Sequence, residues 1–438
     1  MPIILNPDQQ RALTDMCSAV AMRRQHVLTG YAGTGKTTVV QEFARELKKW
    51  DFPRDGTGNE RSDDTIPAQD AFVLTAPTHK ACEVLQRKTN APVRTIHSLL
   101  SLRPGKAQGD RRPFVRGPNA RPVTENVVVI DEASMLSSDL MDHIDCHLAG
   151  RAVILVGDPA QLPPVGEVRS RAFDVMPQTN LRDIVRQAEG NPILRASQML
   201  RDQQGNNRID WTWAGPAREG NLGIFLPGDN LHGWMRKAFC SDEFADDPDT
   251  VRYLCWTNTR VAETNNRIRR WIYGDGVKPG WQPGERMLLR SPWKNPKTDE
   301  IVLAINQEVG VLECVPGIDE KLGFDLYHCR VRDDGGMVHE IFVPANGEQF
   351  QAACDRVKAD ALAFKIEWED YHKFLEEYVR AQHIYAITVH NSQGSTFRRV
   401  FVDLPDIRRR ARTNVLECLQ LLYVACTRPS ETLMLAGI

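Results

Sequence analysis

A glycine-rich stretch, Gly-Tyr-Ala-Gly-Thr-Gly-Lys-Thr at residues 30–37, constrains the fold of this chain more than any other feature. It follows a short apolar run at residues 26–29 and precedes residues 38–50, whose apolar side chains have helical spacing. Glycines let backbone N–H groups approach phosphate oxygens, and the start of a helix adds the positive end of its dipole. The pattern therefore predicts a phosphate-binding loop between a strand and a helix.

Each polar residue of this loop has an expected task. Lys36 neutralises the β- and γ-phosphates of a nucleotide, and the Thr37 hydroxyl holds Mg²⁺. ATP and Mg²⁺ are therefore the expected substrate and cofactor. The residues expected to bind the nucleotide are Gly30, Gly33, Thr34, Gly35, Lys36, Thr37 and Thr38.

Two further apolar runs end in polar residues suited to phosphate chemistry. Residues 127–130 are all apolar and deliver Asp131 and Glu132, where ligands bind in open α/β sheets. Asp131 suits the Mg²⁺ shell, and Glu132 suits a general base that orients water on the γ-phosphate. Kinases of this fold usually need no second carboxylate, so Glu132 favours hydrolysis over transfer. After residues 153–157, Gln161 can sense the γ-phosphate without competing for the metal.

Composition bounds the remaining possibilities. The chain has 438 residues and a formal net charge of −2, so any polyanion must be held by local basic patches. The ten cysteines include no Cys-x-x-Cys pair, which gives no support to a zinc or disulfide framework. The N-terminus does not resemble a signal peptide, and no apolar run approaches the roughly 20 residues that span a bilayer. A cytoplasmic location, in a bacterium or a phage-infected host, is expected.

The pattern of apolar runs predicts an α/β fold with two parallel sheets. We expect a first domain at residues 1–177 and a second at residues 178–272 and 384–438. Between the two parts of the second domain, residues 281–344 contain short β-type runs that predict a small β-barrel, and residues 348–383 lack Pro and Gly and read as helical. The barrel and helical insertion together should span residues 273–383.

A second insertion interrupts the first domain at residues 103–124. It carries six Arg or Lys residues against the single acid Asp110, and four prolines exclude a regular helix. A surface excursion and a small basic projection that touches nucleic acid both account for this composition. Phe114 is its only aromatic residue.

These strings, in this order, resemble superfamily 1 helicases of the 5′-to-3′ Dda/RecD-like group. The resemblance covers residues 5 to about 430. The strings that carry it lie at residues 30–38, 76–81, 95–100, 131–135, 157–165, 181–187, 257–258, 388–395 and 422–428. The resemblance implies two RecA-like domains in tandem, an SH3-like barrel in the second, and an ATP-dependent motor for DNA replication, recombination or repair.

The resemblance also assigns roles that the residues alone do not. Gln9 matches an amide that reads adenine, and Arg186 and Arg428 match two arginine fingers that stabilise charge on the γ-phosphate. Phe114 would stand at or near the tip of a pin that splits duplex DNA. The expected partners are single-stranded DNA and duplex junctions, with single-strand-binding or replication proteins as further candidates, and a monomer is expected. The expected DNA contacts are Pro77, Thr78, His79, Thr95, His97, Phe114, Thr257, Asn258 and His390.

Three departures from the family pattern lie away from these catalytic positions: Asn391, Pro429 and Gln307. Other functions stay open from sequence alone. A P-loop phosphotransferase would hydrolyse ATP without regard to DNA, but it would not use Gln161, Arg186 and Arg428 together. A loader or remodeller of protein–DNA complexes would show DNA-stimulated ATPase without strand separation. An RNA-directed motor is separated from a DNA motor only by 2′-OH contacts.

Overall fold

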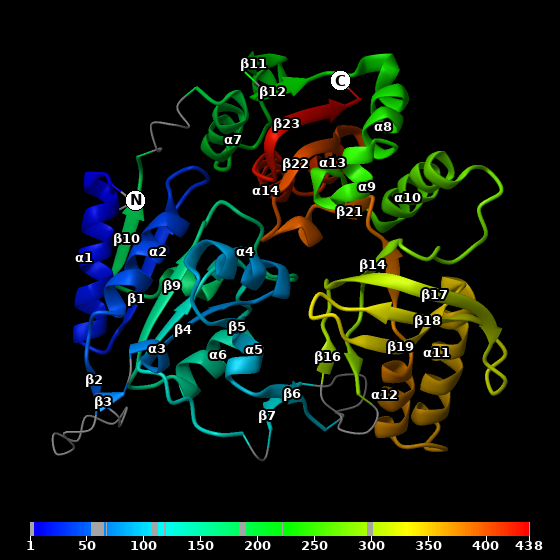
Figure 1. Cartoon of the computed structure of the whole chain (residues 1–438), viewed down its shortest axis with the longest axis horizontal. Coiled ribbons are helices and arrows are strands. Elements are labelled where there is room, and N and C mark those ends of the chain that lie inside the picture. Colours follow the sequence, from blue (N-terminus) through cyan, green and yellow to red (C-terminus); the bar gives the residue numbers. More distant parts are fainter. Residues whose placement is uncertain are drawn as a thin grey trace. The chain divides into compact units, whose positions relative to one another are not determined.

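The computed structural model describes residues 4–53, 65–66, 68–106, 113–117, 120–183, 190–220, 222–295 and 301–437 (Figure 1). The chain forms two compact units. Unit 1 comprises residues 1–101, 118–261 and 387–438, and unit 2 comprises residues 102–117 and 262–386. Among the described residues, no helix combines the length and apolar character needed to cross a bilayer.

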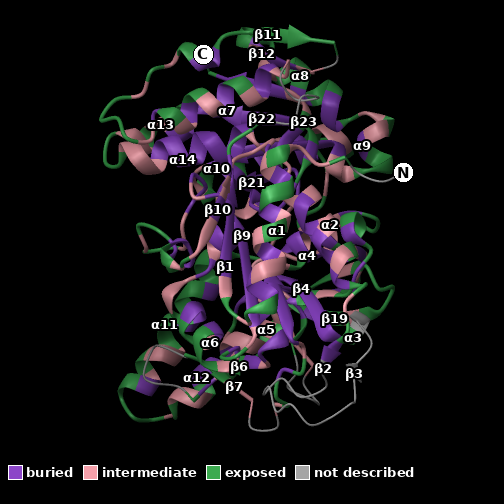
Figure 2. Ribbon diagram, turned by 90° about the vertical axis from the view of Figure 1, so that its left-hand side faces the viewer, coloured by how far each residue is buried: buried purple, intermediate pink, exposed green. Residues whose placement is uncertain are grey.

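The first sheet of unit 1 contains six strands in the order β10-β1-β9-β8-β4-β5, and every neighbouring pair is parallel. Its strands are β1 (Gln25–Gly30), β4 (Phe72–Ala76), β5 (Val93–Thr95), β8 (Val127–Ile130), β9 (Ala152–Gly157) and β10 (Gln178–Leu181). The central strands β4, β8 and β9 are buried along their whole length, and Figure 2 shows β4 and β9 in the colour of buried residues. Strands this apolar on both faces need covering layers on both sides, which the helices supply.

The helices around this sheet include α2, for which residues 38–50 were expected and Lys36–Leu47 are found. They are α1 (Pro7–Ala21), α2 (Lys36–Leu47), α3 (Ala68–Ala71), α4 (His79–Thr89), α5 (Ile96–Leu99) and α6 (Ser138–His147). Met16 of α1 and Phe43 and Leu47 of α2 are fully buried in the same core cluster as Leu28 and Val156 of the sheet. This packing holds the start of α2, and therefore the glycine-rich loop, against the carboxyl end of β1. A short strand pair, β2 (Phe52–Pro53) and β3 (Thr65–Ile66), lies beyond α2.

The edge strand β10 corrects the predicted end of the first domain. Residues 178–181 were expected to open the second domain, but β10 pairs with β1 in parallel, from Val27 opposite Gln178 to Gly30 opposite Leu181. Alternating polar residues hid this strand, because an edge strand is paired through its backbone and needs only one apolar face. The first sheet therefore extends past residue 177.

The second sheet of unit 1 has the order β11-β12-β23-β22-β13-β21. The pairs β12–β23, β22–β23 and β13–β22 are parallel, and β11 is antiparallel to β12. The strands are β11 (Ala217–Glu219), β12 (Leu222–Phe225), β13 (Val251–Cys255), β21 (Ala386–Thr388), β22 (Phe397–Asp403) and β23 (Pro429–Ala436). The helices that precede or connect these strands in the sequence are α7 (Pro192–Asp202), α8 (Leu231–Phe239), α9 (Asp242–Asp246), α10 (Asn258–Tyr273), α13 (Leu404–Ala411) and α14 (Val415–Cys426). From Cys418 onward α14 is buried on every face, as its apolar sequence requires.

Unit 2 is built on an antiparallel sheet of order β19-β18-β17-β14-β20, which confirms the predicted β-rich insertion. Its strands are β14 (Arg286–Leu289), β17 (Glu308–Ile318), β18 (Asp325–Arg332), β19 (Val338–Pro344) and β20 (Ala381–His383), with a separate pair β15 (Trp293–Lys294) and β16 (Ile301–Leu303). Its helices are α11 (Gly347–Leu362) and α12 (Trp368–Glu377). Phe350 and Phe374 from these helices pack with Phe324 and Tyr378 in one aromatic cluster.

The helical reading of residues 348–383 was only partly right. α11 ends at Leu362, and Phe364 then adopts a φ of 56°, a left-handed conformation that stops a helix. Residues 381–383 form β20, which pairs with β14 in the antiparallel sheet. Residues 381–383 carry no strong helix signal, so backbone pairing with the edge of β14 determines their conformation.

The basic insertion contains a hairpin of β6 (Leu102–Pro104) and β7 (Phe114–Arg116). The two strands are antiparallel, with Pro104 opposite Phe114. Phe114 is 48% exposed. Residues 107–112 and 118–119, which the prediction of a projecting pin also covers, lie outside the described residues.

Candidate active site

The glycine-rich loop has the backbone conformation that its sequence predicts. Gly33 and Gly35 adopt φ values of 82° and 80°, in the left-handed region that side chains disfavour. At Gly30, a Cβ atom would lie 2.6 Å from the Thr34 hydroxyl, so only glycine fits there. The Lys36 ammonium donates hydrogen bonds to the carbonyl oxygens of Gly30 at 2.6 Å and Tyr31 at 3.1 Å. The loop is therefore folded around its own lysine.

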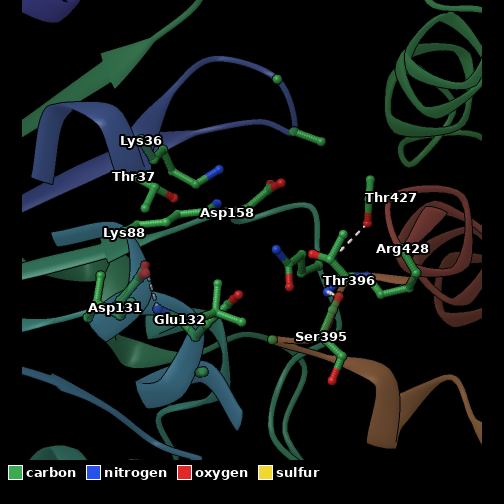
Figure 3. A pocket seen from close by; sticks show the side chains of 17 residues that line it. Lys36, Thr37, Lys88, Asp131, Glu132, Asp158, Ser395, Thr396, Thr427 and Arg428 are labelled. Carbon is green, nitrogen blue, oxygen red and sulfur yellow. Dashed lines mark hydrogen bonds between the residues drawn. The ribbon is translucent and has the colours of Figure 1, made fainter. Parts of the chain in front are cut away.

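A pocket of about 220 Å³ opens beside this loop and lies entirely within unit 1. Figure 3 shows Lys36, Asp131 and Glu132 facing it from the first sheet, and Thr396 and Arg428 facing it from the second. The predicted site residues that line this pocket are Gly33, Lys36, Thr37, Asp131, Glu132, Gln161 and Arg428. Residues of the first and last thirds of the chain thus meet at one site.

Two carboxylates stand at the end of β8. The backbone N–H of Glu132 donates to Asp131 Oδ1 at 2.9 Å, and Glu132 itself adopts a φ of 53°. A non-glycine residue in this region stores strain of about 1 kcal/mol or more, which is tolerated mainly at functional sites. Burial and the neighbouring Asp131 together raise the pKa of Glu132 to about 7, against the opposing charges of Arg428 and Lys36. A carboxyl group with this pKa can exchange a proton near neutral pH.

Gln161 presents an unused acceptor to the pocket. Its backbone N–H donates to the Asp158 carbonyl at 3.2 Å, which fixes the turn after β9. Its side-chain Oε1 is buried and has no hydrogen-bond partner among the described residues. Since buried polar atoms are nearly always paired, an orphaned oxygen in a pocket indicates a missing ligand or water.

Arg428 follows α14 and reaches the pocket from the second sheet. Its guanidinium donates to the carbonyl oxygens of Ser395 at 3.0 Å and Val424 at 3.1 Å, and to the Thr427 hydroxyl at 2.8 Å. Burial lowers the pKa of Arg428, and Glu132 is the largest of the groups that raise it. The side chain is therefore a buried cation held by polar oxygens beside the carboxylate. The second predicted finger, Arg186, lies outside the described residues.

Five pocket residues with polar side chains were not assigned roles from the sequence: Lys88, Asp158, Ser395, Thr396 and Thr427. Lys88 extends from α4, on the face that also turns Ala81, Val84 and Leu85 to the pocket. That face has the spacing i, i+3, i+4 and i+7, so helical periodicity starting from residue 81 could have found it.

Gln9 has internal partners in this structure. Its side-chain Nε2 donates to the Thr34 carbonyl at 3.1 Å, and its Oε1 accepts from the Asn6 N–H at 3.1 Å. Together with Asn6 it forms a capping box at the start of α1. It braces the glycine-rich loop from behind, and its predicted contact with adenine stays a prediction.

The expected DNA contacts in the first sheet follow the carboxyl ends of β4 and β5. Thr78 caps α4 by accepting from the Ala81 N–H at 3.2 Å, and Thr95 caps α5 by accepting from the Ser98 N–H at 3.2 Å. Pro77 and His97 are half-buried, and His79 is exposed. Because the strands are parallel, these residues lie along one edge of the sheet.

The expected contacts in the second sheet occupy the corresponding edge. Thr257 and Asn258 follow β13, and His390 follows β21. The Thr257 hydroxyl donates to Asp406 at 2.9 Å, whereas Asn258 is exposed at the start of α10. His390 is half-buried, and burial lowers its pKa, which favours the neutral ring. Their contact with DNA stays a prediction.

Comparison with known proteins adds a family context to this geometry. Residues 4–215 match the model of an AAA domain, and residues 383–436 match a UvrD-like helicase C-terminal domain. The RecBCD enzyme subunit RecD of Mycobacterium tuberculosis is 30% identical over 98% of this chain and 69% of its own length. The ATP-dependent DNA helicase Dda of Enterobacteria phage T4 is 24% identical over 97% of each chain.

A solved structure supports the fold. The Bacteroides Pif1 helicase, crystallised with ADP-AlF3 and single-stranded DNA, superposes with a TM-score of 0.51. It is 16% identical, and the match covers 99% of this chain and 92% of that one. The two sheets of unit 1, with their helices, form RecA-like domains in tandem, and the β-rich and helical segment of unit 2 is inserted in the second.

Proposed function

Because the chain belongs to the Dda/RecD-like group of superfamily 1 DNA helicases, we propose that its pocket hydrolyses ATP to drive 5′-to-3′ movement along single-stranded DNA and separation of duplex. The observation that carries this proposal is the convergence of Lys36, Glu132 and Arg428 in one pocket. A phosphotransferase needs a lysine such as Lys36. A motor also needs a residue such as Arg428, which comes from the second sheet and so connects the two sheets through the nucleotide.

The chemistry follows from the charges that face the pocket. Glu132 takes a proton from the attacking water, and Gln161, through its free Oε1, accepts a hydrogen bond that orients the same water. Lys36 leaves its loop carbonyls to neutralise the phosphates. Arg428 stabilises the charge that spreads over the γ-phosphate as the bond breaks.

Thr37 and Asp131 are the residues that would hold Mg²⁺. Both line the pocket, one with a hydroxyl and one with a carboxylate. This donor set fits, since protein-bound Mg²⁺ usually takes one or two protein oxygens and fills its remaining positions with water and phosphate oxygens. When bound, the ion would neutralise charge on the β- and γ-phosphates.

Movement arises because the site needs both sheets. The γ-phosphate of ATP attracts Arg428 towards Glu132, and loss of the γ-phosphate removes this attraction. The predicted DNA contacts divide between the two sheets, with Thr78 and Thr95 on one and Thr257 and His390 on the other. Repeated approach and release would shift the strand relative to one sheet at a time. Contacts of this kind should favour phosphates and stacked bases, because a motor must accept any sequence.

The biological setting is also a proposal. The two relatives named above come from a phage and from a bacterium, and the chain spans nearly the whole of the phage relative. We place the protein in the cytosol of a bacterium or a phage-infected host, acting as a monomer on junctions formed in replication, recombination or repair.

Strand separation on tailed duplexes tests the proposal. The wild-type chain should unwind a duplex with a 5′ single-stranded tail and leave a 3′-tailed duplex intact, and single-stranded DNA should stimulate its ATPase more than RNA of the same sequence. Lys36→Ala should lose turnover by at least about 100-fold, as removal of one preorganised charge contact does elsewhere, while its circular dichroism stays unchanged. Unwinding of only the 3′-tailed substrate contradicts the polarity. ATPase without any unwinding identifies a loader or remodeller instead.

A further inference from the structure

A buried tyrosine connects the phosphate loop to the helix that precedes the arginine finger. Tyr423 lies in α14 and is 1% exposed. Its hydroxyl donates to Asp158 Oδ2 at 2.5 Å and accepts from the Ala32 N–H at 3.1 Å. One oxygen thus joins three segments that are far apart in sequence: the phosphate loop, the turn after β9 and α14.

Both partners of this hydroxyl belong to the nucleotide pocket. Ala32 and Asp158 line the pocket, whereas Tyr423 itself does not. Tyr423 is therefore buried behind the pocket wall, and its hydroxyl acts on the pocket through those two residues. Asp158 is itself held in place, because its Oδ1 accepts from the Ala160 N–H at 3.0 Å.

The position of Tyr423 relative to Arg428 gives this contact its meaning. Arg428 stands five positions after Tyr423, just beyond the end of α14 at Cys426. The Arg428 Nε donates to the Val424 carbonyl at 3.1 Å, so the arginine is tied to the residue next to Tyr423. A shift of the phosphate loop that moves the Ala32 amide must therefore strain or carry the end of α14.

Packing alone does not require the hydroxyl. A phenylalanine ring would fill the same space, and burying a hydroxyl is favourable only where it is fully hydrogen-bonded. Here the hydroxyl uses its proton for a carboxylate and a lone pair for a backbone amide, which is a complete set of strong partners. A second contact joins the phosphate loop to another helix, since the guanidinium of Arg201 in α7 lies 4.1 Å from the centre of the Tyr31 ring.

We propose that Tyr423 is a positioning residue for ATP hydrolysis. Its hydroxyl fixes the position of α14 relative to the phosphate loop. Nucleotide binding to the loop therefore sets the position of Arg428. This inference rests on the proposed ATPase function and adds to it a group that acts through Arg428 without touching substrate.

The test is Tyr423→Phe, which keeps the ring and removes both hydrogen bonds. The kcat of DNA-stimulated ATP hydrolysis should fall about 10-fold or more, the effect of losing a hydrogen bond to a charged group, and the KM for ATP should stay within about twofold. Tyr253→Phe is the matched control, because Tyr253 is also buried and its hydroxyl donates to a carboxylate, Asp403, at 3.1 Å. The control should lose comparable thermal stability and keep its kcat.

A second variant keeps the test decisive if Tyr423→Phe folds poorly. Asp158→Asn weakens the same contact from the other side and should lower kcat with the same unchanged KM. In the double variant the two losses should not add, since both remove one interaction. Additive losses, or a wild-type kcat in Tyr423→Phe, overturn the positioning role. A wild-type chain without DNA-stimulated ATPase overturns the proposed function instead.

Discussion

Single residues around the pocket are placed at a cost in stability. Glu132 holds a left-handed backbone conformation, and its carboxyl group faces Asp131. Gln161 keeps an acceptor without a partner among the described residues, and Arg428 is a buried cation. Each arrangement is unfavourable in isolation, and each becomes favourable once a polyphosphate and its attacking water are present. These unfavourable arrangements therefore occur at the residues for which we propose catalytic roles.

Glu132→Gln should separate binding from hydrolysis. The amide keeps the size of the side chain but cannot take a proton from water, so kcat should fall about 10²- to 10⁴-fold. Affinity for a fluorescent ATP analogue should hold or increase, because a negative charge has left the pocket. Steady-state ATPase and titration measure the two effects. Glu125→Gln is the control, since that carboxylate does not line the pocket and pairs with the exposed Arg94. Near-normal turnover in Glu132→Gln would remove it from the role of base.

The residues that sequence could identify are those whose spacing is fixed by local geometry. Lys36 and Thr37 sit at set distances from glycines, and Asp131 and Glu132 follow an apolar strand. Tyr423 could not be found this way. It lies in a run of apolar residues in α14, and its meaning depends on Ala32 and Asp158, which are 391 and 265 residues away. Such contacts are set by tertiary packing, which no local pattern encodes.

At the scale of elements, β1 carries a buried histidine that makes the first sheet sensitive to acid. The Thr179 hydroxyl donates to Asp15 at 2.6 Å and lies 3.1 Å from His26 Nε2, so Nε2 must carry the proton. His26 Nδ1 is buried without a partner among the described residues. Burial lowers the pKa of His26, and Asp15 opposes this. A second proton on the ring would therefore lack an acceptor.

Unit 1 should accordingly lose stability below about pH 6.5, the ordinary pKa of histidine. Above that pH the ring is neutral in both states, whereas below it the unfolded chain binds a proton that the folded chain resists, until the folded pKa is passed. Urea denaturation at pH 8 and pH 5.5 should show a loss of about 1 kcal/mol from this group. His26→Gln should remove that part of the difference. An unchanged pH dependence in the variant would contradict the assignment.

Unit 2 depends on a buried carboxylate that links its helix and sheet. Glu285 accepts from Arg269 at 3.1 Å, from the Tyr385 hydroxyl at 2.8 Å and from the Gln282 N–H at 2.8 Å. Burial raises the pKa of Glu285, but hydrogen bonds led by His383 outweigh it and hold the pKa below its ordinary value. The group is therefore ionised and paired at neutral pH.

Glu285→Gln should destabilise unit 2 by about 3 kcal/mol, because Arg269 would remain buried without its counter-charge. Hydrogen exchange of the β14 and β17 amides measures this, and protection there should fall while protection in β1 and β9 is kept. Glu340→Gln is the control, since that side chain is 66% exposed on β19. Equal effects of the two substitutions on amide protection would show that the Arg269–Glu285 pair does not stabilise unit 2.

Elements were predictable where apolar period and length agree. β8 was expected at residues 127–130 and is found there, because four buried apolar residues leave no other register. β10 and β20 were missed, since both are short edge strands whose backbone pairing outweighs weak local preference. The boundary predicted after residue 177 was misplaced for the same reason, because β10 pairs with the first sheet, whereas the prediction of an α/β fold did not depend on it.

At the scale of the whole molecule, the two units divide the expected work. Unit 1 holds every residue that lines this pocket, from Ala32 to Arg428, and so contains the residues that we propose for hydrolysis. Unit 2 contains the hairpin of β6 and β7, whose Phe114 is predicted to meet the duplex. Hydrolysis and strand separation should therefore be separable by substitution.

Phe114→Ala is the substitution that tests this division. The ring is 48% exposed and borders the described end of the hairpin, so its loss should leave the fold and the ATPase within about twofold of wild type. Strand separation should fall about 10-fold, because an aromatic ring that stacks on a base is worth about 1–3 kcal/mol. Val115→Ala is the matched control, since successive residues of a strand point to opposite faces. Unwinding by Phe114→Ala at the wild-type rate would show that the hairpin does not separate strands through this ring, and a parallel fall in ATPase would place Phe114 in the hydrolytic cycle.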